Sequence, residues 1–134
     1  DWDEILSFRG RTGPYLQYAH ARQASILRKY GEEISGDVNF DRLDDEEEFA
    51  LVKMLDQLPQ VVEHSIKDHE PHVIATYLLD LAAAYSTYSQ DAKRHRVVSD
   101  DAELTAARVL LVSCVRTVIQ RGLWLLGIKA PQQM

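Results

Sequence analysis

Near the start of the sequence, two tyrosines and two basic residues are spaced so that their side chains could bind RNA together. Tyrosine rings offer flat surfaces on which unstacked bases can lie, and Arg or Lys beside them can meet phosphate or stack in turn. The same pattern can complete a hydrophobic core, so on its own it leaves both readings open. On an α-helix, an arc of about 80° would hold the whole stripe: Tyr15, Tyr18, Arg22, Ser25 and Lys29.

A second basic cluster follows Tyr88 and comprises Lys93, Arg94 and Arg96 around His95. Cations are favoured at the C-terminal end of a helix by its macrodipole, and the same side chains could contact RNA phosphates. Three more arginines on the last predicted helix could hold the phosphates of a stem without reading its sequence: Arg108, Arg116 and Arg121.

The sequence gives no support for catalysis or for a metal site. His64, His69 and His72 lie close together in the chain, but their spacing does not place them on one helical face and Pro71 separates the last two. No Ser-His-Asp set, glycine-rich phosphate loop or pair of carboxylates in an apolar setting is present. We therefore expect no catalytic residue, no metal ligand and no cofactor in this chain.

The charge is unevenly distributed along the chain. The net charge is -6, which argues against a phosphate-binding partner if it is taken as an average. Residues 1–30 carry three acids and five bases, whereas residues 31–60 carry ten acids and two bases. Residues 61–90 carry four acids and one base, and residues 91–134 four acids and seven bases. If the two basic ends meet in the fold, they would form one positive face opposite a negative one.

The size and composition predict a single domain. A chain of 134 residues with 46% hydrophobic content can bury one core. No apolar run is long enough to span a bilayer and the first residues are acidic, so we expect neither a membrane span nor a signal peptide. The single cysteine, Cys114, cannot form an intrachain disulfide, which suits a cytoplasmic protein, and its apolar neighbours predict burial.

Helical periodicity and helix breakers divide the chain into about five helices. Thr12 and Pro14 suit the start of the first helix, Gly31 its end, and residues 31–42 a surface connection. Acids in residues 44–48 suit an exposed helix start because the free amides there carry partial positive charge. We expect helices over about 15–30, 44–58, 59–69, 71–92 and 100–126, with no strand.

Two glycines shape the expected end of the last helix. Gly122 is predicted to interrupt it, and Gly127 to close it. Its apolar residues cover most of its circumference, so this helix should be central. The predicted fold class is all-α, an irregular bundle of about five helices.

Two stretches of the sequence resemble arginyl-tRNA synthetases. The first is Thr12-Gly13-Pro14-Tyr15-Leu16-Gln17-Tyr18-Ala19-His20-Ala21-Arg22, and the second is Gly122-Leu123-Trp124-Leu125-Leu126-Gly127-Ile128-Lys129-Ala130-Pro131 with Met134 at the end. The resemblance is to the C-terminal anticodon-binding domain of that family, of the DALR type. It covers nearly the whole chain, as one domain over residues 1–134 with a leading segment 1–14.

The resemblance implies an all-α domain that receives the anticodon loop of arginine tRNA. By matching position, it assigns contacts with that loop to Tyr15, Tyr18, Arg22, Tyr88 and Met134. Met134 could keep this role only if the chain ends there. The catalytic domain is absent from this chain, which lacks both signature motifs of class I ligases. We therefore expect a non-catalytic piece of a longer cytoplasmic ligase, whose catalytic domain would use ATP and Mg²⁺.

Three hypotheses follow for function. In the first, the chain is a tRNA-binding module, with no membrane or DNA partner, that docks on the catalytic domain of its parent. In the second, it is a protein-interaction module that uses acidic residues 32–48 and has lost RNA binding. In the third, it is mainly a structural support for the synthetase body. For the first hypothesis, the predicted tRNA-binding residues are Tyr15, Tyr18, Arg22, Lys29, Tyr88, Lys93, Arg94, Arg96 and Met134.

Overall fold

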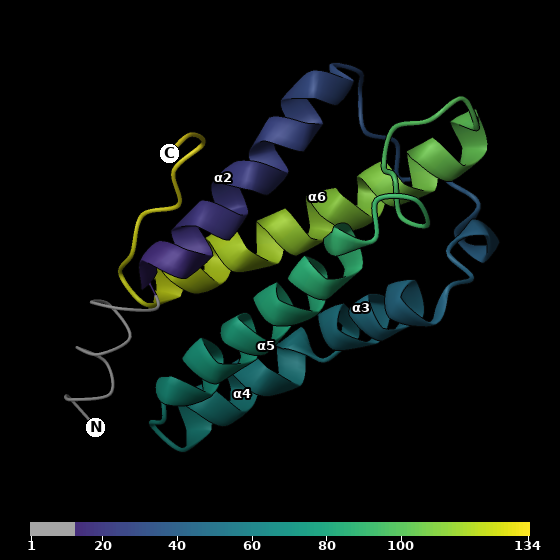
Figure 1. The fold of residues 1–134 in the computed structure, drawn as a ribbon. Helices are drawn as coiled ribbons and strands as arrows, with labels where there is room; N and C mark the ends of the chain where they lie inside the picture. Colours follow the sequence, from purple (N-terminus) through teal and green to yellow (C-terminus); the bar gives the residue numbers. More distant parts are fainter. Residues whose placement is uncertain (1–12) are drawn as a thin grey trace.

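The computed structural model describes residues 13–134 as a bundle of α-helices (Figure 1). No strand occurs among these residues, which confirms the predicted all-α class. The leading residues, including Thr12 and its predicted capping role, lie outside the described part of the chain. The elements are α2 (Gly13–Tyr30), the short 3₁₀ helix η2 (Phe40–Arg42), α3 (Glu46–Asp56), α4 (Leu58–Lys67), α5 (His72–Gln90) and α6 (Ala102–Leu125).

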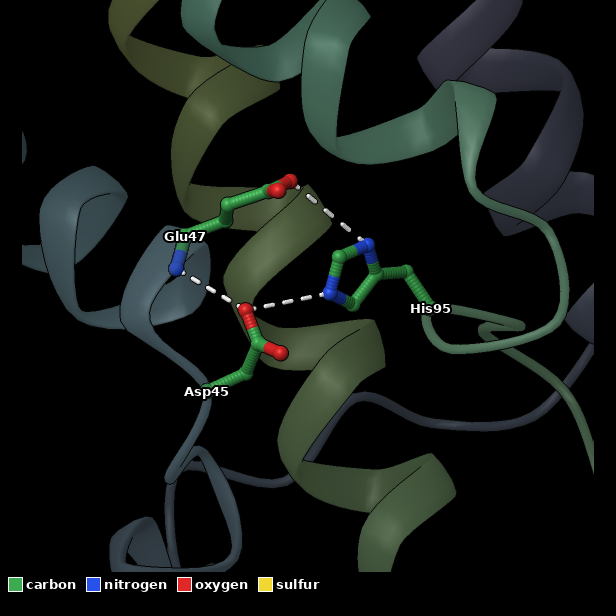
Figure 2. Close-up of side chains that lie close together, drawn as sticks. All are labelled: Asp45, Glu47 and His95. Atoms are coloured by element: carbon green, nitrogen blue, oxygen red, sulfur yellow. Dashed lines mark hydrogen bonds and ion pairs between the residues drawn. The ribbon is translucent and has the colours of Figure 1, made fainter.

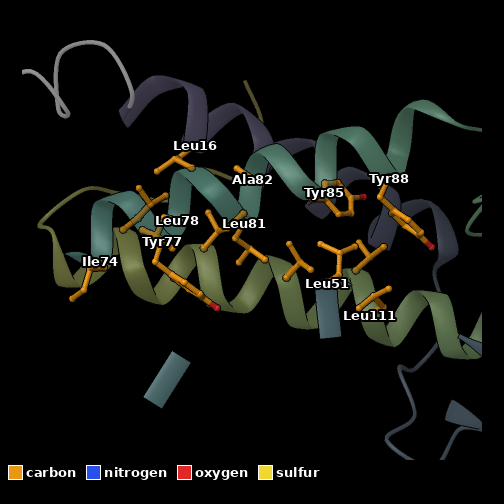
Figure 3. Close-up of a cluster of buried hydrophobic side chains, with 14 of the residues drawn as sticks. Leu16, Leu51, Ile74, Tyr77, Leu78, Leu81, Ala82, Tyr85, Tyr88 and Leu111 are labelled. Atoms are coloured by element: carbon orange, nitrogen blue, oxygen red, sulfur yellow. The ribbon is translucent and has the colours of Figure 1, made fainter. Parts of the chain in front are cut away.

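Helices α5 and α6 cross the middle of the bundle. Helix α2 lies along α6 and also touches α5, while α3 and α4 pack against α5 from the other side (Figure 1). Many of the side chains that fill the space between these helices are aliphatic and almost completely buried (Figure 3). They include Leu16, Leu51, Leu78, Leu81, Val112, Ile119 and Leu123.

The helix boundaries follow the capping residues of the sequence. Asp45 caps α3, since its side chain accepts a hydrogen bond from the Glu47 amide at 2.8 Å. Asp101 caps α6 in the same way through the Leu104 amide. Pro59 lies in the first turn of α4, where a missing N–H costs nothing.

Gly127 ends α6 as predicted. Its φ is +73°, a conformation that glycine adopts without strain. The amide of Ile128 donates to the Leu123 carbonyl at 2.8 Å and that of Gly127 to the Trp124 carbonyl at 2.9 Å. These two bonds form a Schellman motif, which turns the chain into residues 128–134.

The prediction that Gly122 interrupts the last helix is wrong. Helix α6 continues through it to Leu125. A Cβ atom at Gly122 would lie 2.6 Å from both δ-carbons of Leu78 on α5. The glycine therefore allows the two central helices to approach closely.

Two local predictions of burial are also corrected. Glu48 was expected to be exposed with the other acids at the start of α3, but its side chain is fully buried. Cys114 was expected in the core, yet it is exposed on α6.

Within the described residues, no helix is both long and apolar enough to cross a membrane.

Candidate nucleic-acid interface

The predicted stripe on α2 is exposed along the outer side of the helix. Tyr15 and Tyr18 are 43% and 50% exposed, although both carry large aromatic rings. The guanidinium carbon of Arg22 lies 5.8 Å from the centre of the Tyr18 ring, within the range of a cation–π contact. The structure therefore brings these three predicted residues together, with Lys29 exposed further along the helix.

A small groove of about 100 Å³ lies between this stripe and α5. Its α2 wall consists of Tyr15, Tyr18, Ala19, Arg22 and Ile26, and its α5 wall consists of Ala82, Tyr85, Ser86 and Ser89. Neither Tyr88 nor Met134 lines it. An open cleft with aromatic rings and a cation on one wall and hydroxyl groups on the other could hold one unstacked base.

The α5 wall was not predicted from the sequence. The side chain of Tyr85 is almost buried. Burial raises the pKa of Tyr85 to about 12, against the lowering effect of the Arg22 charge. Its hydroxyl thus keeps its proton and can donate a hydrogen bond. The spacing of Ala82, Tyr85, Ser86 and Ser89, which places them on one helical face, was the available signal.

Tyr88 does not lie at the surface where the prediction placed it. The side chain is 1% exposed, and its ring stacks on His95 with 4.2 Å between ring centres. Burial also raises the pKa of Tyr88 well above the usual value. A base could reach this ring only if the segment after α5 moved away, so in this structure Tyr88 is a packing residue.

The basic segment after α5 is only partly available to an anion. Arg94 is paired with Asp45 and lies within 3.8 Å of Glu47 and 3.6 Å of Asp91. Its charge is therefore largely offset by neighbouring acids. Lys93 and Arg96 are exposed, and within residues 13–134 neither has an ion-pair partner.

Arg108 is not available for phosphate, which corrects the prediction made for it. It is almost buried, and its Nη2 lies 2.8 Å from Oε1 of Glu48. It also donates to the carbonyl oxygens of Arg94 at 2.6 Å and Arg96 at 3.1 Å. Arg108 therefore holds the backbone of the basic segment to the core.

His95 completes this anchorage (Figure 2). Its Nδ1 lies 2.7 Å from the Tyr88 carbonyl oxygen, and its Nε2 lies 3.1 Å from Oδ1 of Asp45. Burial would raise the pKa of Asp45, but hydrogen bonds from the Glu47 amide, Arg94 and His95 together lower it to about 2.

The three side chains in Figure 2 could in principle be considered as metal ligands. However, Glu47 faces Nδ1 of His95 while Asp45 faces Nε2, and Asp45 already caps α3. We interpret the cluster as a hydrogen-bonded clamp between α3 and the basic segment. The three histidines for which the sequence did not support a metal site are arranged differently, as His64 and His72 lie within 3.7 Å of Glu70 on the surface.

Helix α2 and the end of the chain differ from the rest of the sequence in their charge. Helix α2 contains no acidic residue, and neither does any position from Leu104 to Met134. Helix α2 packs along α6, so these two segments without acidic residues are neighbours in the fold (Figure 1). The net negative charge is thus concentrated elsewhere, mainly between residues 31 and 60.

Comparisons with known proteins agree on one family. The sequence profile described as "DALR anticodon binding domain" matches residues 16–134. The chain is 42% identical to an arginine–tRNA ligase of Pyrococcus abyssi, covering 99% of this chain and 21% of that protein. It is 43% identical to that of Lactococcus lactis subsp. lactis, covering 100% and 23%. The chain thus spans about a fifth of the length of these curated relatives.

Solved structures show the same likeness. The fold is similar to a Thermus thermophilus arginyl-tRNA synthetase with a TM-score of 0.78 and 38% identity, covering 96% of this chain and 22% of that one. It is also similar to the Plasmodium falciparum arginyl-tRNA synthetase with a TM-score of 0.73 and 25% identity, covering 100% and 23%.

Proposed function

Since this chain belongs to the family of DALR anticodon-binding domains of arginyl-tRNA synthetases, we propose that it binds the anticodon loop of arginine tRNA through α2. The observation that carries this proposal is the exposed stripe of Tyr15, Tyr18 and Arg22 beside the groove to α5. The chain would serve a longer arginine–tRNA ligase, whose remaining part would carry out ATP-dependent aminoacylation.

In the proposed complex, one loop base leaves its stack and lies against Tyr18 or Tyr15. Its polar edge then faces the hydroxyl groups of Ser86, Ser89 and Tyr85 across the groove. Arg22 and Lys29 meet the phosphates that flank this base, with Lys93, Arg94 and Arg96 as more distant backbone contacts. Because Arg94 is paired with acids, it should contribute less than the other cations.

The test is a titration of this chain with arginine tRNA and with a tRNA whose middle anticodon base is changed. Tyr18→Ala should weaken binding of the first tRNA by about 1–3 kcal/mol, the usual value of one stacked base. Phe40→Ala is the matched control, because Phe40 is also an exposed aromatic residue but lies in the acidic part of the chain. Equal binding of both tRNAs, unaffected by Tyr18→Ala, would reject anticodon recognition.

A docking role is the second candidate, and one observation favours it. Trp124 is 75% exposed and Leu125 lies exposed beside it near the end of α6. Exposed apolar patches of this kind often mark contacts with another protein surface. If docking is the main role, Trp124→Ser should weaken association with a ligase that lacks this domain, and the isolated chain should not bind tRNA.

A further inference from the structure

The last residues of the sequence are fastened to α2 by three side chains. After Gly127 the chain turns back and runs along the helix (Figure 1). Gln17 donates to the Lys129 carbonyl at 2.8 Å, and Arg28 donates to the Gln132 carbonyl at 2.9 Å. Between them, Nδ1 of His20 lies 2.7 Å from the Pro131 carbonyl oxygen. We call residues 128–134 the tail.

The chemistry of His20 fixes the direction of its bond. A carbonyl oxygen can only accept, so Nδ1 must carry the proton that joins the ring to Pro131. The side chain is completely buried. Burial lowers the pKa of His20, the bond to Pro131 raises it, and the nearby Arg116 charge lowers it again, with a net lowering. The neutral Nδ1–H tautomer is therefore the form that holds the tail.

All three acceptors in the tail are main-chain oxygens. Contacts of this kind fix where the backbone lies but leave the side chains of the tail free to face outward. Gln17, His20 and Arg28 fall on one arc of α2, roughly opposite the stripe of Tyr15 and Tyr18 at 100° per residue. Helix α2 thus presents one flank to the tail and another to the groove.

We infer that Gln17, His20 and Arg28 are positioning residues for RNA binding, which hold the tail and its Lys129 and Met134 beside the helix that bears Tyr18. This inference rests on the proposed function. Met134 is 69% exposed and Lys129 is also exposed, so both can meet RNA if the backbone between them is held in place. An unfastened tail would have to be ordered on binding, which costs affinity.

Arg28 allows a direct test because its neighbour Lys29 carries the same charge but makes no hydrogen bond to the tail among the described residues. If Arg28 acts through the tail, its replacement should lower RNA affinity only when the tail is present. If it meets phosphate directly, its loss should be felt in every background, like that of a neighbouring exposed lysine. Lys29→Ala is therefore the matched control, since no hydrogen bond links Lys29 to the tail within the described residues.

The experiment measures arginine tRNA affinity for Gln17→Ala/Arg28→Ala in the full chain and in a chain that ends at Ile128, which lacks all three acceptor carbonyls. We expect an affinity loss of about tenfold in the full chain and none beyond the truncation itself in the shorter one. Lys29→Ala should weaken both chains equally. An equal loss from the double variant in both chains, or no loss in the full chain, would overturn the inference.

Methionine methyl NMR gives a readout that a general loss of stability would not produce. The chain has two methionines, and Met54 on α3 serves as an internal reference. Without RNA, the double variant should narrow the Met134 methyl signal, as expected for a chain end that moves more freely, and leave that of Met54 unchanged. A Met134 signal that is unaffected by the double variant would overturn the role of the tail contacts. Failure of the proposed function would appear separately, as unchanged tRNA affinity in Tyr18→Ala.

Discussion

The most consequential single residues in this chain are polar groups in the core. The Glu48 carboxylate and the Arg108 guanidinium lie within 2.8 Å of each other, both out of contact with most solvent. A buried ion pair contributes modestly to stability when it is intact, since both charges lose their hydration. Removing one partner is strongly destabilising, because the other charge then remains buried without a partner.

We predict that Arg108→Met destabilises the fold by about 3–5 kcal/mol, because it strands Glu48 and two loop carbonyls. The free energy of unfolding from urea titrations followed by circular dichroism measures this effect. Arg42→Met is the control, since Arg42 pairs with Asp101 and Glu103 at the surface and its loss should cost much less stability. Similar losses in the two variants would contradict the structural role of Arg108.

His20 should make stability depend on pH. Its pKa is lowered in the folded chain from the ordinary value of 6.5, mainly by burial, so the unfolded chain takes up a proton more readily. The free energy of unfolding must then fall as pH falls below about 6.5. Urea titrations at pH 7.5 and 5.5 should show a smaller pH effect in His20→Gln, whose amide can still donate to Pro131. His72→Gln, at an exposed site, should behave like the unmodified chain.

At the scale of helices, α5 and α6 approach each other closely at Gly122. Alanine is favoured over glycine in a helix by about 1 kcal/mol, so local propensity alone predicts that Gly122→Ala is stabilising. The structure predicts the reverse, because the new methyl group would overlap Leu78. The steric cost should exceed the gain in helix propensity, since overpacking a core costs about 1–3 kcal/mol.

The prediction is that Gly122→Ala lowers the thermal midpoint, measured by circular dichroism, while the same change in a Leu78→Ala background does not lower it further. The smaller side chain would leave room for the methyl group. Gly36→Ala is the control, because nothing lies within 4 Å of the added atom there. A stabilised Gly122→Ala variant would mean that the two helices can separate at little cost.

The helices were largely predictable because their boundaries depend on local chemistry. Pro59 and Gly127 each act on the backbone within a few residues, and they began and ended a helix as expected. The failures concern long-range contacts. The burial of Glu48 depends on Arg108, 60 residues away. The presence of a glycine at position 122 inside α6 depends on the side chain of Leu78, which packs against it. No window of sequence around either residue contains that information.

The same distinction applies to the candidate site. The stripe of Tyr15, Tyr18 and Arg22 could be predicted because it lies on one helix with a regular period. Its partner wall on α5 could not, because the sequence does not say which face of α5 meets α2. Tyr88 was misplaced for a related reason, since its burial depends on His95 folding back over it.

For the whole molecule, the position of charge should matter more than its sum. Electrostatic effects on RNA are screened within about 8 Å at physiological ionic strength. Arg22→Gln/Lys29→Gln and Asp44→Asn/Glu46→Gln each change the net charge by two units, in opposite directions. The first pair removes cations from α2, and the second neutralises exposed acids in the acidic part of the chain.

We predict that the loss of the two cations weakens tRNA binding about tenfold and lowers the slope of log affinity against log salt by roughly 1–2. Neutralising the two acids should change affinity less than twofold. Filter binding over a range of salt concentrations measures both quantities. Comparable effects of opposite sign would show that net charge governs binding instead.

The contacts of Arg108 also bear on the order in which the chain assembles. Its partners come from the start of α3 and from the segment after α5, while Arg108 itself belongs to α6. Burial of the Arg108 charge is compensated only when α6, the start of α3 and the segment after α5 are all in place. These hydrogen bonds should therefore form late in folding, after the helices have packed together. Arg108→Met should then accelerate unfolding far more than it slows folding. The guanidinium would act as a latch on the finished bundle, setting how long a folded molecule lasts before it opens.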